Sequence, residues 1–153
     1  MSGVYLTLWD KELKDKSVVL HPVKSGWAHI TVAYTDKLLP VPKLIEIAAI
    51  VFPYWAMKEV KLQWAYVNTF TMQPSGATRH DVLISLSPED TELITSMRAS
   101  YLLPYAGSDQ FVMRTPHTTH SIHENRESAE ATAEMLNRDH LPRNVRVTGV
   151  AID

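Results

Sequence analysis

The sequence predicts an α+β domain built mainly on antiparallel sheet, and three observations support that fold class. Runs of alternating or β-favouring residues recur along the chain, and stretches with helical spacing separate them. The expected order is strand, strand, helix, strand, strand, helix, strand, helix, strand. A strand containing His-x-Thr occurs twice in this order, and a helix follows it each time. This arrangement favours one core with an internal duplication, so we expect a single domain over residues 1–153 with two related lobes.

The first strand is expected from Val4 to Trp9, which is apolar and aromatic and precedes a charged turn. A loop around residues 21–26 leads into the first strand with His-x-Thr, at about residues 27–35. Pro40 and Pro42 then mark the entry to a helix. The inward face of this helix is expected to consist of Leu44, Ile47, Ala48 and Val51.

Pro53 is expected to end or kink that helix, because proline removes a backbone hydrogen bond. The clearest period-two pattern of the chain follows it, over residues 60–67. This pattern predicts a strand whose buried face consists of Val60, Leu62, Trp64 and Tyr66. Trp64 and Tyr66 are therefore interpreted as a packed sheet face, the alternative being a platform on which a base stacks.

In the second half, residues 81–86 are expected to pair with the preceding strand after a turn at residues 74–76. Ser87 is predicted to cap a helix whose inward side chains are Leu93, Ile94, Met97 and Tyr101. Residues 104–109 are expected to form a loop, and residues 110–123 contain the second strand with His-x-Thr. Asn125 is predicted to cap a helix over residues 126–138, with Ala129, Ala133 and Leu136 facing inward. The last strand is expected at residues 145–152.

The two His-x-Thr sequences are the candidate catalytic groups. They are His29-Ile30-Thr31-Val32 and His117-Thr118-Thr119-His120. Strand side chains alternate between faces, so each His and its Thr are expected on the same side of the sheet. Two imidazoles and two hydroxyls around one cleft suit phosphodiester chemistry without a metal. One His takes a proton from the attacking oxygen and the other protonates the leaving oxygen, while the Thr hydroxyls hold phosphate oxygens.

With these two motifs, the chain resembles the two-histidine (2H) phosphoesterase superfamily, whose members have one H-x-[ST]-x motif in each of two related lobes. His120 departs from the pattern, because the family usually has an apolar residue at that place. The resemblance implies a bilobal α+β fold, with mainly antiparallel sheets, flanking helices and a central cleft. In size and layout the chain also resembles the phage anti-CBASS nucleases of that superfamily, which degrade cyclic oligonucleotide messengers. A shared Gly-x-Tyr-x-Thr first strand implies that Tyr5 binds substrate.

A metal site is the competing interpretation of the second motif. His117, His120 and His123 follow one another at intervals of three residues, and imidazole binds zinc, copper and nickel. On a regular strand His117 and His123 would share one face, while His120 would point to the other. Because three such ligands would not converge, we expect neither a metal nor another cofactor.

Composition narrows the possible partners. The formal net charge of -2 is spread over both signs, so we expect neither duplex nucleic acid nor a membrane surface as a partner. The chain has no cysteine and no evident signal peptide, and we expect a soluble cytoplasmic protein. No Gly-rich phosphate loop and no Gly-x-Ser-x-Gly elbow is present, which argues against a nucleoside triphosphatase or a serine hydrolase.

The expected function is a metal-independent phosphodiesterase for RNA-type or cyclic nucleotide linkages, with a nucleotide or a cyclic oligonucleotide as substrate. The sequence does not assign the acid and base roles to His29 and His117, and it does not give the oligomeric state. The alternative is a module of the same fold that binds a nucleotide or a protein without turnover.

Overall fold

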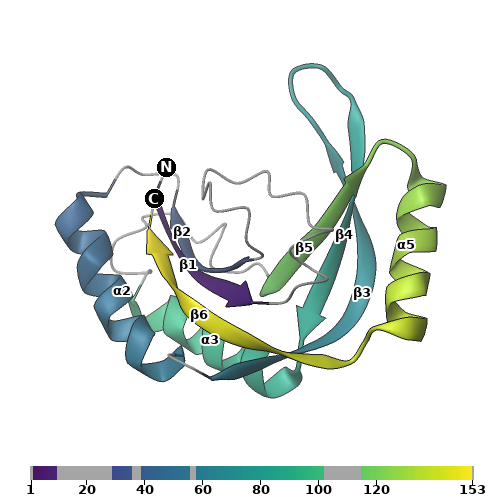
Figure 1. Ribbon diagram of the computed structural model, residues 1–153. Helices are drawn as coiled ribbons and strands as arrows, with labels where there is room; N and C mark the ends of the chain where they lie inside the picture. The colour runs from purple at the N-terminus through teal and green to yellow at the C-terminus, as the bar shows by residue number, and fades with distance from the viewer. Residues whose placement is uncertain (1, 10–28, 36–38, 56–57, 102–114, 153) are drawn as a thin grey trace.

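The computed structural model describes residues 2–9, 29–35, 39–55, 58–101 and 115–152 (Figure 1). The predicted order of strands and helices is confirmed within these ranges. The elements are β1 (Ser2–Trp9), β2 (His29–Thr35), α2 (Val41–Trp55), β3 (Glu59–Thr71), β4 (Thr78–Leu86), α3 (Pro88–Tyr101), β5 (His117–His123), α5 (Arg126–Asp139) and β6 (Arg143–Ile152). The loops predicted at residues 21–26 and 104–109, and the first residues of both predicted motif strands, lie outside the described residues.

All described strands belong to one antiparallel sheet with the order β2-β1-β6-β3-β4-β5. The two strands with His-x-Thr, hereafter the motif strands, are therefore its opposite edges. The sheet is strongly bent, with β6 and β3 at the middle of the bend and helices on its outer side (Figure 1). Residues of β2 and β5 approach each other to within 8 Å between Cα atoms. The bend thus brings together two edges that four strands separate in the sheet order.

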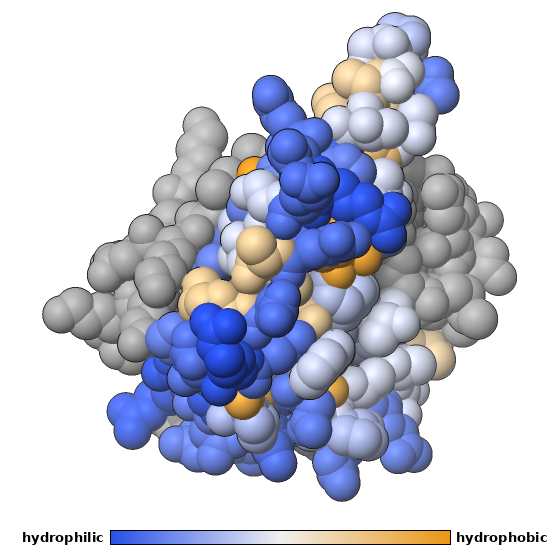
Figure 2. Space-filling model, turned by 90° about the vertical axis from the view of Figure 1, so that its right-hand side faces the viewer, coloured by the Kyte–Doolittle hydropathy of each residue, from blue (hydrophilic) through white to orange (hydrophobic). Residues whose placement is uncertain are grey.

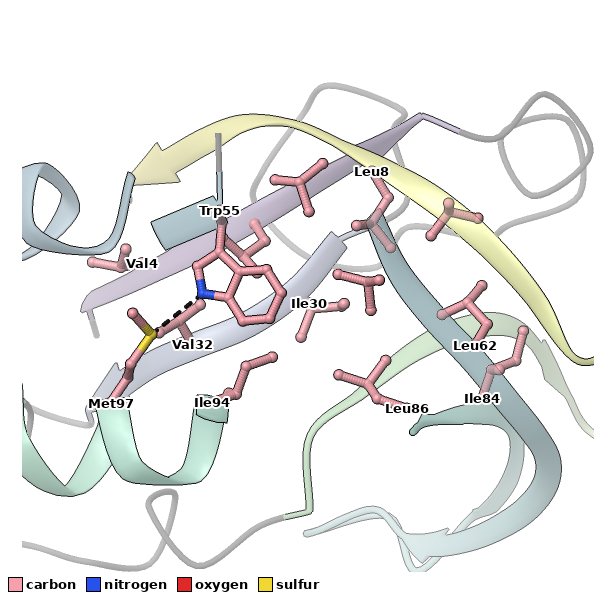
Figure 3. Packing of buried hydrophobic residues seen from close by; sticks show 14 of the residues in the cluster. Val4, Leu8, Ile30, Val32, Trp55, Leu62, Ile84, Leu86, Ile94 and Met97 are labelled. Carbon is pink, nitrogen blue, oxygen red and sulfur yellow. Dashed lines mark hydrogen bonds between the residues drawn. The ribbon is translucent and has the colours of Figure 1, made fainter. Parts of the chain in front are cut away.

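The sheet has two distinct faces. The core face packs against the helices and includes Val4, Leu6 and Leu8 of β1 and Val82, Ile84 and Leu86 of β4. Trp55 of α2 lies inside this core, and its indole N–H donates to the Met97 sulfur of α3 at 3.3 Å (Figure 3). The opposite face is called the site face here. It displays the alternate residues of the same strands.

The helix starts follow the predicted caps. Ser87 Oγ accepts a hydrogen bond from the Asp90 backbone N–H at 3.3 Å and donates one to the Asp90 carboxylate at 3.0 Å. Asn125 Oδ1 accepts from the backbone N–H groups of Glu127 and Ser128. Each cap satisfies backbone donors that have no partner within the first turn, so the local sequence fixes where α3 and α5 begin.

The sequence predicts that α2 ends or kinks at Pro53. The helix does not end there, because it continues to Trp55. Pro53 stands in the last turn, where few intrahelical hydrogen bonds depend on it. Burial of the Trp55 indole among α2, α3 and the sheet stabilises the turn that follows the proline.

The predicted buried face of β3 is also wrong beyond Leu62. Leu62 pairs with Leu86, but Trp64 pairs with Ser85, so Gln63 is an extra residue that forms a β-bulge. A one-residue shift exchanges the two faces of a strand. Ala65 is consequently 2% exposed on the core face, while Trp64 is 57% exposed on the site face.

The outer surface of α5 is hydrophilic over most of its area, and the β3–β4 hairpin projects beyond it (Figure 2). Its inward side chains are Ala129, Ala133 and Leu136, as predicted, and Arg126 pairs with Glu130 on the outside at 2.8 Å. This is the pattern of a helix with one solvated face. Within the described residues, no helix is long and apolar enough to cross a membrane.

Candidate active site

The four predicted catalytic side chains lie on the site face. His29, Thr31, His117 and Thr119 are each partly accessible, whereas Ile30 and Thr118 between them are 0% and 1% exposed. Each motif thus places an imidazole and a hydroxyl side by side on one face. The two pairs belong to the edge strands that the bend of the sheet brings near each other.

A β-bulge follows each motif at the same place. In β2 the pairing with β1 skips Val32, because Tyr5 pairs with Thr31 while Val4 pairs with Ala33. In β5 the pairing with β4 skips His120. The extra residue therefore comes directly after the motif Thr in both strands. Bulges bend a strand and re-aim its side chains, so the two motifs share backbone geometry as well as sequence.

The cross-strand neighbours of the motifs also correspond. Thr7 lies opposite His29, and Ser85 lies opposite His117. Directly paired residues of an antiparallel sheet share a face, so each imidazole has a hydroxyl residue beside it on the site face. The two halves of the sheet, β2-β1-β6 and β3-β4-β5, thus repeat one layout, with the motif strand outermost in each.

The His117 ring is held by the backbone. Its Nδ1 lies 2.9 Å from the Thr115 carbonyl oxygen. Because a carbonyl oxygen only accepts, Nδ1 carries the hydrogen, and Nε2 is the ring atom that would exchange a proton with a substrate. This contact with the Thr115 carbonyl oxygen sets both the tautomer and the orientation of the His117 ring.

The His29 ring is held by an aromatic contact. The Tyr5 and His29 rings meet edge to face, with centroids 5.5 Å apart and an interplanar angle of 87°. The Tyr5 side chain is 0% exposed, and a Cβ atom on Gly3 would fall on its ring and hydroxyl. Gly3 therefore makes room for Tyr5, and Tyr5 supports His29. The structure shows this contact for Tyr5, and its predicted role in substrate binding stays a prediction.

Arg98 of α3 holds the bulge of β2, and sequence reasoning missed this residue. Its guanidinium donates to the carbonyl oxygens of Thr31 at 2.6 Å and of Val32 at 2.9 Å. Burial lowers the pKa of Arg98 to about 10, so the group stays protonated at neutral pH. Arg98 lies four residues after Ile94 on the inward stripe of α3, and a charged residue at an inward helical position was the available signal.

A charged pair lies further along the site face of β4. Arg79 donates to the Asp81 carboxylate at 3.0 Å and lies over the Phe70 ring. Burial raises the pKa of the Asp81 carboxyl, and the positive charges of Arg79, His117 and His123 act in the opposite direction. Asp81 Oδ1 is buried and has no hydrogen-bond partner among the described residues. The sequence offered no pattern that distinguished this pair from ordinary strand residues.

The predicted sharing of a face by His117 and His123 is wrong, and the bulge at His120 is the reason. His123 pairs with His80, which lies on the core face with Val82 and Ile84, whereas His117 pairs with Ser85 on the site face.

The two histidines of β5 on the core face, His120 and His123, form hydrogen bonds to serines. Ser121 Oγ lies 3.0 Å from His120 Nδ1 and 2.8 Å from His123 Nε2, and His123 Nδ1 lies 2.9 Å from Ser128 Oγ of α5. Ser121 thus links the two imidazoles. Among the described residues, no group of three or more His, Cys, Asp or Glu is placed to hold a metal ion.

The fold class predicted from the sequence, an α+β domain with mainly antiparallel sheet and flanking helices, is confirmed. The chain is similar in structure to Usb1 of Kluyveromyces marxianus, with a TM-score of 0.50 and 13% identity over 99% of this chain and 96% of that chain. A structure of the same Usb1 with uridine monophosphate gives a TM-score of 0.49 and 12% identity, with the same coverage. At such identities the likeness establishes the fold alone. No protein-family model and no curated protein matches the chain.

Proposed function

We propose that this protein is a metal-independent phosphodiesterase that cleaves RNA-type or cyclic nucleotide linkages by two-histidine acid–base catalysis. One observation carries the proposal. Two His-x-Thr motifs lie on opposite edges of one bent sheet, both face the accessible side, and both are followed by a bulge at the same position. A scaffold has no physical need to repeat this arrangement, whereas a phosphate held between an acid and a base requires two such groups.

The roles follow from the chemistry of the groups. A neutral imidazole takes the proton of the attacking hydroxyl, which is either a ribose 2′-hydroxyl or water, as its oxygen bonds to phosphorus. The second imidazole, which starts protonated, gives its proton to the leaving oxygen as the P–O bond breaks. Thr31 and Thr119 donate hydrogen bonds to the non-bridging oxygens, where negative charge accumulates. The rate should fall at low pH, where the base is protonated, and at high pH, where the acid is deprotonated.

The narrower substrate class rests on the resemblance of the sequence to anti-CBASS nucleases, in size, in layout and in the first strand around Gly3 and Tyr5. On this basis a cyclic oligonucleotide messenger in the cytoplasm is the substrate we propose. Other phosphodiesters with a ribose, including 2′,3′-cyclic nucleotides and RNA ends, are compatible with the same motif chemistry.

The test is a panel of cyclic dinucleotides, cyclic trinucleotides, 2′,3′-cyclic nucleotides and short RNA, incubated with the protein in the presence of chelator. Turnover of at least one substrate is expected, with products identified by mass spectrometry. Activity that disappears with chelator and returns with zinc would contradict the mechanism and favour a metal site.

The alternative is a module that binds nucleotides without turnover. Such a module would bind members of the panel and return them unchanged. The parent protein and the His29→Ala variant would both give no product. Binding without any product therefore separates this alternative from the enzyme.

A further inference from the structure

The position of Trp64 is unexpected for a large apolar side chain. The bulge at Gln63 turns it away from the core, and 57% of its surface is exposed. Burial of an aromatic ring stabilises a fold, so a strand that places one on its accessible face forgoes that contribution. The neighbouring Ala65 occupies the core position instead.

The register of the sheet places Trp64 in line with a catalytic motif. Trp64 pairs with Ser85, and Ser85 pairs with His117, so these three residues form one row across β3, β4 and β5. Directly paired residues share a face, which puts all three side chains on the site face. Neighbouring strands are about 4.8 Å apart, so Trp64 lies roughly 10 Å from His117 along the row.

We infer that Trp64 is the base-stacking subsite of the active site, an inference that rests on the proposed phosphodiesterase function. A phosphate at His117 would place its ribose over Ser85 and its base over the Trp64 indole. The Ser85 hydroxyl donates to the Trp64 carbonyl oxygen at 3.2 Å, so its lone pairs remain able to accept from a ribose hydroxyl. The row therefore offers contacts for phosphate, sugar and base in the order in which a nucleotide presents them.

Within the described strands, the other half of the sheet has no aromatic residue at the corresponding position of its row. At the corresponding position Thr7, opposite His29, pairs with Gly149, which has no side chain. In the described strands, the row that contains His117 thus ends in an indole, whereas the row that contains His29 ends in a glycine. The substrate is consequently expected to have a base on the His117 side of the scissile phosphate. Stacking on an indole tolerates different bases, so the subsite recognises that a base is present rather than which base it is.

The test compares a ligand with a base and a ligand without one. The test uses the His29→Ala protein, because this substitution on the opposite motif strand should block turnover and leave the His117 side intact. This protein is titrated calorimetrically with 2′,3′-cyclic AMP and with ribose 5-phosphate. Adding Trp64→Ala should weaken binding of the cyclic nucleotide by about 5- to 150-fold, the range that base–aromatic stacking supplies. Binding of ribose 5-phosphate should not change, and Trp64→Phe should restore most of the lost affinity.

Tyr54→Ala is the matched control, because Tyr54 is an exposed aromatic residue on α2. It should bind both ligands as the His29→Ala parent does. Unchanged affinity of the Trp64→Ala protein for the cyclic nucleotide, or equal losses for both ligands, would overturn the subsite and leave the proposed function standing. If the His29→Ala parent binds neither ligand, the proposed function fails, and the subsite fails with it.

Discussion

His29 and His117 differ in what holds their rings in place. A backbone carbonyl accepts from His117 Nδ1–H, whereas the His29 and Tyr5 rings meet edge to face. The contact of His117 fixes a tautomer, and the contact of His29 helps to fix the position of its ring. The two imidazoles thus have different surroundings, which is compatible with one acting as the acid and the other as the base.

The substitution Gly3→Ala tests whether Tyr5 supports the ring of His29. An added Cβ would collide with the ring and hydroxyl of Tyr5, which is fully buried. We expect Gly3→Ala to lower the free energy of unfolding by about 1–3 kcal/mol, the usual cost of overpacking. Displacement of His29 should also reduce turnover, by up to about a hundredfold for a shift near 1 Å. Urea unfolding and steady-state kinetics measure the two effects, and unchanged values of both would contradict the role of Tyr5.

Asp81 predicts a pH dependence of stability. Burial raises the pKa of this carboxyl in the folded protein above its ordinary value of 3.8. Between these two pKa values the folded state binds more protons than the unfolded state, so this group makes stability fall as pH rises above 3.8. Asp81→Asn removes the titration. The stability of the variant relative to the parent should therefore increase as pH rises through this window and then stay constant.

Urea unfolding of both proteins at several pH values measures this difference. A relative stability that is independent of pH, or that changes in the opposite direction, would show that burial does not dominate at Asp81.

Bulges connect the sequence to the site. The motif strands each contain one directly after the Thr, and β3 contains one at Gln63. Arg98 donates to two consecutive carbonyl oxygens at the bulge in β2, those of Thr31 and Val32. The helix α3 thereby fixes the backbone on which Thr31 stands.

Arg98→Met keeps roughly the length of the side chain and removes the hydrogen bonds to the Thr31 and Val32 carbonyl oxygens. Each charged hydrogen bond contributes about 1.5–3 kcal/mol, and relief of the buried charge offsets part of the loss. We expect a net destabilisation of about 1.5–3 kcal/mol. Turnover of the folded variant should fall more than KM changes, because the variant misplaces Thr31 and leaves Trp64 untouched. A folded variant with normal kcat would show that the contact is only structural.

His120→Ala separates the bulge residue from the motif that precedes it. The His120 side chain is buried on the core face and contacts Ser121. Its loss should reduce thermal stability while turnover of the folded protein stays within a few-fold of the parent, because no proton transfer depends on it. A loss of turnover as large as that of His117→Ala would mean that His120 is the catalytic residue of the second motif.

The sequence predicted the order of elements, both predicted caps and the facing of each His-x-Thr pair, because these depend on short-range patterns. It did not predict the bulges, which arise from pairing between strands and leave no local signature at Gln63 or His120. For that reason the sequence pattern alone places Trp64 in the core and His123 on the face of His117, and the structure corrects both. Arg98 was missed because its partners, 66 and 67 residues away in the chain, are backbone atoms.

The whole molecule joins two halves of similar layout through one continuous sheet. β6 and β3 pair at its middle, and the motif strands form its two edges. The bend brings β2 and β5 near each other, and α3 contacts both β2 and β4. A single phosphate shared by both motifs would therefore depend on each half equally. Removal of either imidazole should disable the site without disturbing the other half.

The most direct test of this account is the turnover of the best substrate of the panel, in chelator, by the parent protein and by His29→Ala, His117→Ala and His140→Ala. His140 follows α5 and serves as the matched control. Each motif variant should lose about a hundred- to ten-thousand-fold in turnover while its melting temperature stays near that of the parent. The control should keep its activity. Retention of turnover by a folded His29→Ala or His117→Ala protein would contradict catalysis by two histidines.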